Sequence, residues 1–199
     1  MIWSWWIALI LFAAPGLWAL VAIVVDIGNP GQMLGADAGE TLVRHFGEWG
    51  LRMLLVTLAL SSLRRRAGFT QAIRLRRLAG LTAFTYLSLH GLSYLWFLAG
   101  FEWLQIREDL VERAYITVGF AAWLILSVLA VTSTRGWQRR LRQRWQTLHA
   151  LIYLAIPLGI LHLLWLTKAG YAEALVYALV YAILMIERLL ARRSRQTAS

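Results

Sequence analysis

The sequence contains no cysteine. This absence excludes disulfide bonds, thiolate zinc sites, iron–sulfur clusters and cysteine nucleophiles. Acidic residues are also scarce, because only 10 Asp and Glu stand against 20 Lys and Arg. Histidine occurs only four times. A metal or redox site in this chain therefore depends on a few histidines rather than on clustered thiolates or carboxylates.

Hydrophobic residues, by contrast, are abundant and make up 60% of the 199 residues. A transmembrane helix needs roughly 20 mostly apolar residues. Runs of this kind predict an all-α membrane protein, a six-helix transmembrane bundle that forms a single domain over residues 1–199. The first run lacks a basic N-terminal region, so we interpret it as a retained helix rather than a signal peptide. The expected spans are residues 2–25, 47–63, 78–100, 115–134, 148–167 and 171–190.

Arginine is distributed unevenly along the chain. Fifteen arginines lie between the second and third spans, between the fourth and fifth, and in the C-terminal region, where Glu187 is the only acid. The other connections hold nine acids against five basic residues. By the positive-inside rule, both termini are expected to be cytoplasmic. Because the arginines are split among short loops beside the spans, they indicate contact with membrane lipids and not with nucleic acid.

The longest connection on the outer side, residues 26–46, includes the segment DIGNPGQMLGADAGE. Its glycine, asparagine and proline residues predict an irregular loop. The loop is too short to form a domain, and no internal repeat is evident along the chain. We therefore expect one undivided bundle.

Three of the four histidines lie inside expected spans, where ionisable residues are costly and usually functional. His149 is near the inner start of the fifth span, and His162 lies about 20 Å further along it at 1.5 Å per residue. On the third span, Arg77 precedes His90 by the same thirteen residues. The spacing therefore predicts that His90 and His162 lie at one depth in the membrane, the outer level. Arg77 and His149 are expected at a second depth, the inner level.

Two imidazoles that face each other from neighbouring helices suit the axial positions of haem iron. We therefore expect a haem between the third and fifth spans, ligated by His90 and His162. Zinc or a proton relay would need carboxylates in mid-span, and none lie there. The alternative that each histidine only hydrogen-bonds between helices stays open.

The inner level differs because arginine has only donors and is a poor iron ligand. Arg76 or Arg77 is expected to bind a haem propionate, so a second, inner haem at His149 would need another ligand. His149 and His162 lie roughly 140° apart around an ideal helix. Pro157, between them, is the expected position of a kink that would change this angle.

Two further polar residues lie near the outer end of the second span. Arg52 is expected to reach an outer propionate or to extend to the nearby interface. His45 is expected to contact a quinol, a propionate or a partner protein, and the alternative is a solvated histidine at a helix start.

The three span histidines lie in the segments YLSLHGLSYLW, RQRWQTLHALIYL and HLLWL. The segments GADAGETLVRHFGEWGLRMLL and RLRRLAGL open the second and third spans. Together with the six expected spans, these segments resemble the MsrQ family, the haem-binding membrane subunits of the bacterial periplasmic methionine sulfoxide reductase system. That family belongs to the ferric-reductase-like transmembrane group, related to the membrane cores of NADPH oxidases.

The resemblance implies a b-type haem protein of the bacterial inner membrane, with one ferric-reductase-like domain over residues 1–199. It implies electrons taken from the quinol pool or from a cytosolic flavin reductase. The acceptor would be a periplasmic molybdenum-containing methionine sulfoxide reductase, the partner in which catalysis takes place and oxidised proteins are repaired. The family is also associated with FMN, which no motif in the sequence locates.

Carried over to this chain, the resemblance marks His90, His149 and His162 as the ligand-type histidines. Arg77 matches the arginine at the start of the third span, and it replaces a histidine of the NADPH oxidases. Since no GxGxxG follows a strand and nine residues follow Leu190, we expect no independent oxidation of NADPH. Two alternatives remain: a self-sufficient haem-dependent transmembrane metal reductase, and a haem-free membrane scaffold or transporter.

Overall fold

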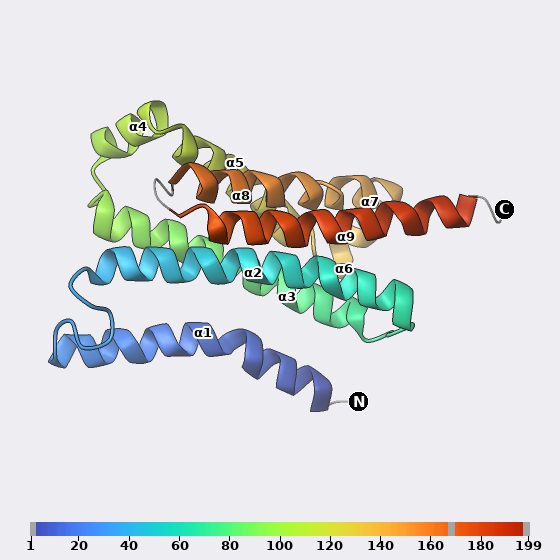
Figure 1. The fold of residues 1–199 in the computed structure, drawn as a ribbon, viewed down its shortest axis with the longest axis horizontal. Coiled ribbons are helices and arrows are strands. Elements are labelled where there is room, and N and C mark those ends of the chain that lie inside the picture. The colour runs from blue at the N-terminus through green and yellow to red at the C-terminus, as the bar shows by residue number, and fades with distance from the viewer. Residues whose placement is uncertain (1–2, 167–169, 197–199) are drawn as a thin grey trace.

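The computed structural model describes residues 3–166 and 170–196, and within them the regular structure is helical throughout (Figure 1). This confirms the all-α class, while the expected span ends at Ile2 and Thr167 lie outside the described residues. The π-helical segment η1 continues α3 directly. The elements are α1 (Trp3–Gly28), α2 (Ala38–Ala67), α3 (Ala72–Ser93), η1 (Tyr94–Leu98), α4 (Trp103–Glu112), α5 (Ala114–Val131), α6 (Arg135–Leu141), α7 (Gln143–His149), α8 (Ile152–Leu166) and α9 (Ala172–Gln196).

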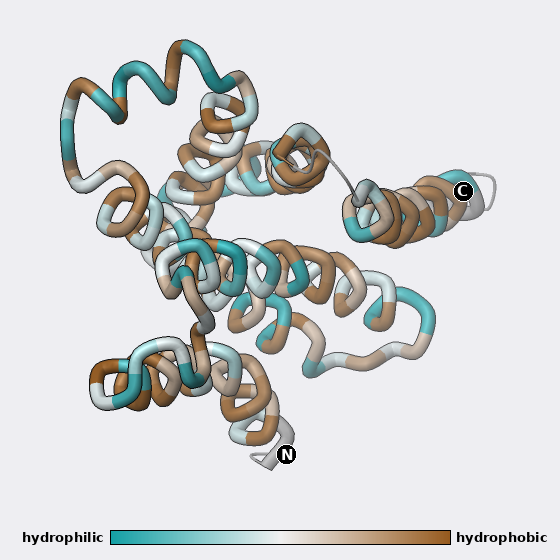
Figure 2. Tube along the Cα trace, turned by 60° about the vertical axis from the view of Figure 1, so that its left-hand side comes forward, coloured by the Kyte–Doolittle hydropathy of each residue, from teal (hydrophilic) through white to brown (hydrophobic). Residues whose placement is uncertain are grey.

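Four segments are long and apolar enough to cross a membrane, and they correspond to the first, fourth, fifth and sixth expected spans. Figure 2 shows hydrophobic residues along most of the long helices, with hydrophilic residues gathered toward their ends and connections. The expected second span lies in α2, and the expected third span, 78–100, runs through α3 and η1. The charged residues of α2 and α3 lower the mean hydropathy of these helices. The four segments are Trp5–Gly28, Ala114–Val131, Gln143–Leu166 and Ala172–Ala191.

Two helix hairpins form the centre of the bundle. α2 packs against α3, and α5 packs against α8, while α1 and α9 flank the hairpins (Figure 1). The largest fully buried side chains are Leu42 and Leu54 on α2 and Ile156 on α8. Because burial of these side chains supplies the main packing energy, α2 is the central helix of the fold.

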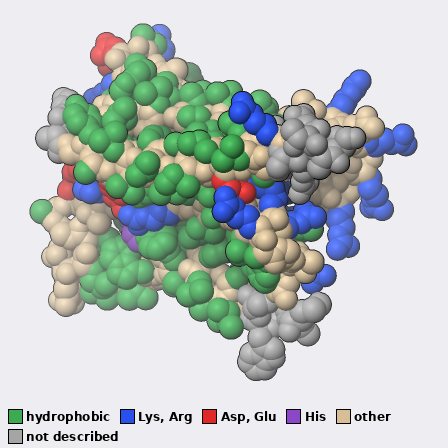
Figure 3. All heavy atoms as spheres, turned by 45° about the vertical axis from the view of Figure 1, so that its right-hand side comes forward, with side chains coloured by type: hydrophobic (Ala, Val, Ile, Leu, Met, Phe, Trp, Pro, Cys, Tyr) green, Lys and Arg blue, Asp and Glu red, His purple; other side chains and the backbone are tan. Residues whose placement is uncertain are grey.

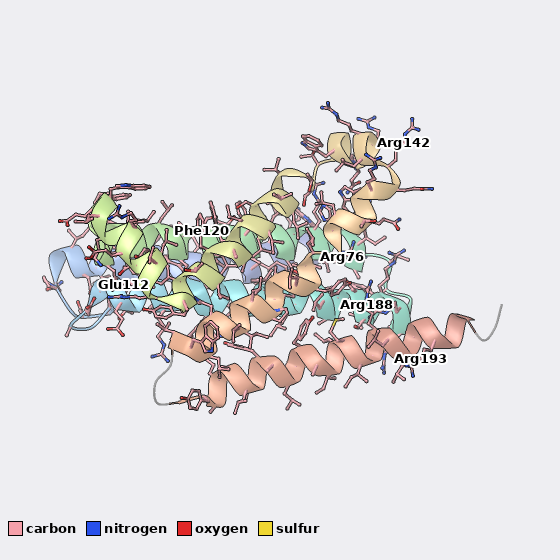
Figure 4. All side chains as sticks on the ribbon, turned by 90° about the horizontal axis from the view of Figure 1, so that it is seen from above. Arg76, Glu112, Phe120, Arg142, Arg188 and Arg193 are labelled. Carbon is pink, nitrogen blue, oxygen red and sulfur yellow. The ribbon has the colours of Figure 1, made fainter. Side chains whose placement is uncertain are left out.

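The two ends of the bundle differ in charge. α1 begins and α9 ends at the same end as the α2–α3 turn, whereas α4 and the α1–α2 loop lie at the opposite end (Figure 1). Figure 3 shows Lys and Arg side chains projecting from the first end, which we call the basic end. In Figure 4, Arg76, Arg142, Arg188 and Arg193 lie toward the basic end, and Glu112 lies at the other.

The α1–α2 loop is shorter than the expected irregular segment 26–46. α2 already begins at Ala38, because the Asp37 carboxylate accepts a hydrogen bond from the Glu40 N–H at 2.8 Å and caps the helix. The Asp26 carboxylate accepts from the backbone N–H groups of Met33 (2.8 Å) and Leu34 (3.1 Å) and folds the rest of the loop. The expectation of an irregular segment up to residue 46 was therefore wrong.

The fifth expected span, 148–167, is not one continuous helix. α7 ends at His149 and α8 begins at Ile152, and the chain between them contains bonds of the tighter i→i−3 type. Leu151 N–H bonds the Leu148 carbonyl and Tyr153 N–H bonds the Ala150 carbonyl, both at 3.0 Å. A tightened turn thus lies directly after His149, eight residues before Pro157.

Pro157 itself lies inside α8 and cannot donate the usual bond to the Tyr153 carbonyl, four residues earlier. That carbonyl accepts instead from the Tyr181 hydroxyl on α9, at 2.8 Å. A neighbouring helix therefore satisfies the backbone group that the proline leaves without a donor, as membrane bundles require.

α1 is bent in its N-terminal half, near Pro15 (Figure 1). The hydroxyl of Tyr86 on α3 donates to the Phe12 carbonyl (2.5 Å) and accepts from the Gly16 N–H (3.0 Å). These two backbone groups would otherwise bond each other within the helix. The inserted hydroxyl explains the bend and fixes α1 on α3.

Candidate functional site

The His90 imidazole on α3 faces α2. Its Nδ1 lies 2.8 Å from the carbonyl oxygen of Val43. A carbonyl only accepts, so Nδ1 carries the proton and Nε2 keeps its lone pair. A Cβ at Gly47 would lie only 2.9 Å from Nδ1, so a glycine is needed for this close approach. His90 is therefore held as the tautomer that binds a metal through Nε2.

The His162 imidazole on α8 faces α5 in the same way as His90 faces α2. Its Nδ1 lies 2.6 Å from the Tyr115 carbonyl oxygen. A Cβ at Gly119 would lie 2.6 Å from Nδ1. His162 therefore also presents Nε2 as a free acceptor, against a glycine on the first helix of its hairpin.

The two environments form a structural repeat that we did not expect from the sequence. In each hairpin, the histidine follows its carbonyl partner by 47 residues. The glycine lies four residues after that carbonyl, and all three positions are offset by 72 residues between the hairpins. Ala83 and Ala155, both completely buried, are related by the same offset. The equal spacing of Gly47–His90 and Gly119–His162 was the sequence signal for this repeat.

The structure brings the two repeated histidines together, as the sequence predicted. The ring centroids of His90 and His162 are 6.0 Å apart, with an angle of 88° between the planes. An imidazole nitrogen binds a metal at about 2 Å, so two rings that share one ion have centroids about 6 Å apart. The described residues contain no group of three His, Asp or Glu side chains that would hold a metal. A two-imidazole donor set suits the axial pair of haem iron.

His149 lies at the inner level in a different state. Its Nε2 is 3.0 Å from the Thr132 hydroxyl, and its ring stacks on Trp145 at 4.0 Å. The Thr132 hydroxyl donates to the Val128 carbonyl (2.7 Å), so it accepts from Nε2–H of His149. The nitrogen that is free in His90 and His162 is thus engaged in His149.

The arginine that reaches the inner level is Arg76 rather than Arg77. Arg77 is exposed, whereas Arg76 is half-buried and hydrogen-bonds the Ser61 hydroxyl at 3.5 Å. Arg76 is also close enough to His149 to act on it electrostatically. The expected pairing of Arg77 with His149 is therefore replaced by Arg76, one position earlier on α3.

Arg52 is engaged by α9 and by its own helix. Its guanidinium donates to Glu48 (2.9 Å), Glu173 (3.3 Å) and the Tyr177 hydroxyl (3.0 Å). It also lies over the Trp49 ring, 5.0 Å from the centroid. Arg52 thus joins α2 to α9, and the expected contact with a propionate would compete with these bonds.

His45 contacts α1. Its Nε2 lies 2.9 Å from the Pro15 carbonyl oxygen, and its ring packs on Trp18 at 4.6 Å. The Pro15 carbonyl is in the bent part of α1, so His45 and Tyr86 together hold that bend. In this structure His45 therefore joins α2 to α1.

α4 supports the Tyr115 carbonyl at the end of the bundle opposite the basic end, where Glu112 lies (Figure 4), which we call the acidic end. The buried Asp109 carboxylate accepts from the Tyr94 hydroxyl and from Gln105 (2.9 Å), and pairs with Arg113 at 3.2 Å. A hydrogen bond to Tyr115 and the charge of Asp109 raise the pKa of Arg113. The cluster fixes the α4–α5 turn, directly before the residue whose carbonyl orients His162.

The chain is similar to known membrane proteins over most of its length. The family described as "Ferric reductase like transmembrane component" matches residues 46–160, from α2 into α8, a segment that contains His90 and His149 and ends two residues before His162. A protein-methionine-sulfoxide reductase heme-binding subunit MsrQ of Xanthomonas campestris pv. campestris (strain 8004) is 49% identical over 166 residues, 81% of this chain and 76% of the relative. The subunit of the same name from Caulobacter vibrioides is 42% identical over 167 residues, 83% of this chain and 79% of the relative.

Proposed function

Since the chain belongs to the MsrQ family of the ferric reductase-like transmembrane group, we propose that it is the haem-binding subunit of a protein-methionine-sulfoxide reductase system. In this role it carries electrons across the bacterial inner membrane. The observation that carries the proposal is the His90–His162 pair, with ring centroids 6.0 Å apart. Both rings present Nε2 because Nδ1 bonds a backbone carbonyl.

A haem b held by these two imidazoles would supply a one-electron carrier. His90 and His162 would hold this haem through Nε2. The Val43 and Tyr115 carbonyls accept from Nδ1–H, which sets the tautomer and raises the basicity of Nε2. The surrounding apolar helices limit access of water and thereby influence the reduction potential. One haem at this outer level is the core of the proposal.

A second haem at the inner level would use His149, with Arg76 near a propionate. It requires that His149 release its bond to Thr132 or bind through Nδ1. The inner site is therefore a secondary part of the proposal. Haem quantification on the purified protein shows whether one or two haems are bound.

The proposed topology places the basic end in the cytoplasm and six helices, α2 and α3 included, across the membrane. Electrons enter from quinol or from a cytosolic flavin reductase and leave at the acidic end. The acceptor is a periplasmic molybdenum-containing reductase, which carries out the reduction of methionine sulfoxide. An acidic docking surface favours a basic face on the partner, so high salt weakens the complex.

The direct test is an optical spectrum with haem quantification on the purified full-length chain. The wild type is expected to show a Soret band that shifts on reduction, and His90→Ala and His162→Ala should each abolish the outer haem signal. His45→Ala is the matched control, because His45 bonds the Pro15 carbonyl and should leave haem in place.

Unchanged spectra in both His90→Ala and His162→Ala would overturn the ligand assignment. A colourless, folded wild type would favour a haem-free scaffold or transporter instead. Reduction of metal ions at full rate without a periplasmic partner would favour a self-sufficient metal reductase.

A further inference from the structure

α4 presents exposed apolar side chains at the acidic end of the bundle. Trp103 is 77% exposed, Leu104 59% and Val111 79%. At 100° per residue these three residues lie within about 100° of one another around the helix, and we call them the apolar side of α4. Exposed apolar groups that gather in this way mark a surface that contacts lipid or another protein.

The acidic residues of α4 occupy the rest of its circumference. Asp109 lies opposite the apolar side and is buried, because its carboxylate accepts from the Tyr94 hydroxyl and pairs with Arg113 at 3.2 Å. Glu108 and Glu112 are exposed and lie between the apolar side and Asp109. α4 therefore has one side toward the protein, one acidic side and one apolar side.

The position of α4 along the bundle corresponds to the edge of a membrane. The neighbouring span, Ala114–Val131, has 18 residues and is about 27 Å long at 1.5 Å per residue. The hydrocarbon core is about 30 Å thick, so the start of α5 lies close to its boundary. α4 ends at Glu112, two residues before α5, and runs across the end of the bundle rather than along it (Figure 4). These are the depth and the direction of a helix in the membrane interface.

The segments on both sides of α4 also expose apolar residues. Before it, Trp96 and Phe101 are each more than half exposed, and their ring centroids are 5.8 Å apart. After it, Phe120 and Leu124 are exposed on α5. Tryptophan is typical of the ends of membrane helices, where the ring lies at the level of the lipid headgroups. Lipid is therefore the occupant that fits the apolar side of α4.

We propose that α4 is an interfacial helix in the membrane leaflet at the acidic end. Its apolar side packs among the acyl chains, and Glu108 and Glu112 face water. Arg107 projects from the apolar side, and its long side chain reaches the lipid phosphates from there. Lipid thereby holds in place the helix that supports the Tyr115 carbonyl.

The test uses spin labels on the full-length protein. Because the chain contains no cysteine, single cysteines give unique attachment sites. Labels at Leu104→Cys and Val111→Cys report the apolar side, and a label at Glu112→Cys reports the acidic side. The protein is reconstituted in vesicles of phosphatidylcholine and phosphatidylglycerol, and collisions with oxygen and with a water-soluble nickel chelate are measured by EPR. Oxygen concentrates in hydrocarbon, so the ratio of oxygen to nickel collisions should be at least about threefold higher on the apolar side than at Glu112.

Two reference positions calibrate these ratios. Leu124→Cys on α5 reports the lipid environment of a candidate span, and Asn29→Cys on the exposed α1–α2 loop reports water. Circular dichroism of each labelled variant checks that the helix content is unchanged.

Two results would overturn the proposal. The first is a ratio at Leu104 and Val111 equal to that at Asn29, which would place this side of α4 in water. The second is a low rate of collision with both reagents at these two positions, which would show that protein covers the apolar side in place of lipid. The labels report without haem, so failure of the interfacial position leaves the proposed electron-transfer function untouched.

Discussion

Gly119 lies so close to the His162 imidazole that a Cβ at this position would be 2.6 Å from Nδ1. The hydrogen bond from Nδ1 to the Tyr115 carbonyl keeps the ring from moving aside. Gly47 and His90 have the same relationship at 2.9 Å. The two glycines thus help to define where the imidazoles lie and how their Nε2 atoms are presented.

Alanine at these glycines is expected to weaken haem binding. Overpacking costs about 1–3 kcal/mol, so Gly119→Ala should reduce haem affinity by roughly tenfold or more, and Gly47→Ala by less. The measurement is haem per protein across a titration of the apoprotein. Gly91→Ala is the control, because nothing lies within 4 Å of a Cβ at that position on α3. Equal affinity in Gly119→Ala and Gly91→Ala would contradict the role of the glycine.

The inner histidine should behave differently from the outer pair. Nε2 of His149 is bonded to Thr132, so His149→Ala is expected to keep the outer haem. Since the outer histidines hold most of the iron in this proposal, the variant should retain more than about half of the wild-type Soret absorbance. The optical spectra of His149→Ala and His90→Ala measured side by side give the comparison. Loss of all haem in His149→Ala would show that the inner level holds the main site.

The Tyr181 hydroxyl is expected to stabilise α8 through the carbonyl that Pro157 leaves without a donor. Tyr181→Phe should lower the free energy of unfolding by about 1–3 kcal/mol, because the Tyr153 carbonyl then has no donor. In a Pro157→Ala background the new N–H can bond that carbonyl, so the same substitution should cost less. Unfolding in detergent measures all four corners of the cycle.

The exposed Tyr171 provides the control for this cycle, as Tyr171→Phe should change little. An identical cost of Tyr181→Phe with and without Pro157 would show that the two residues act independently. The Tyr181 hydroxyl would then not be the group that makes a proline tolerable inside α8.

Apolar runs and histidine spacing predicted much of this fold and its site. The thirteen-residue spacing placed His90 beside His162 because depth along a membrane helix depends only on residue count. The ends of helices were harder to predict. Asp37 and Glu40 have the spacing of a capping box, which would have placed the start of α2 correctly. The short helices α4, α6 and α7 lie in charged connections where no apolar run indicates them.

The rotation of each side chain around its helix could not be derived from the sequence. Arg76 and Arg77 differ by about 100° on α3, and only the packing of α2 determines which one is half-buried. On the fifth span, four i→i−3 bonds between residues 147 and 154 tighten the chain. At three residues per turn they add about 80° and reduce the expected 140° separation of His149 and His162 to about 60°. Both histidines therefore contact α5, at Thr132 and Gly119.

Each hairpin completes the environment of its own histidine, since carbonyl, glycine and imidazole all belong to α2–α3 or to α5–α8. A haem bound by both imidazoles would act as a non-covalent cross-link between two units that are each already formed. Its binding free energy would then add to the association of the hairpins rather than to the folding of either one. Removal of the cofactor is accordingly expected to weaken the packing of α3 against α8, while the helices themselves stay folded.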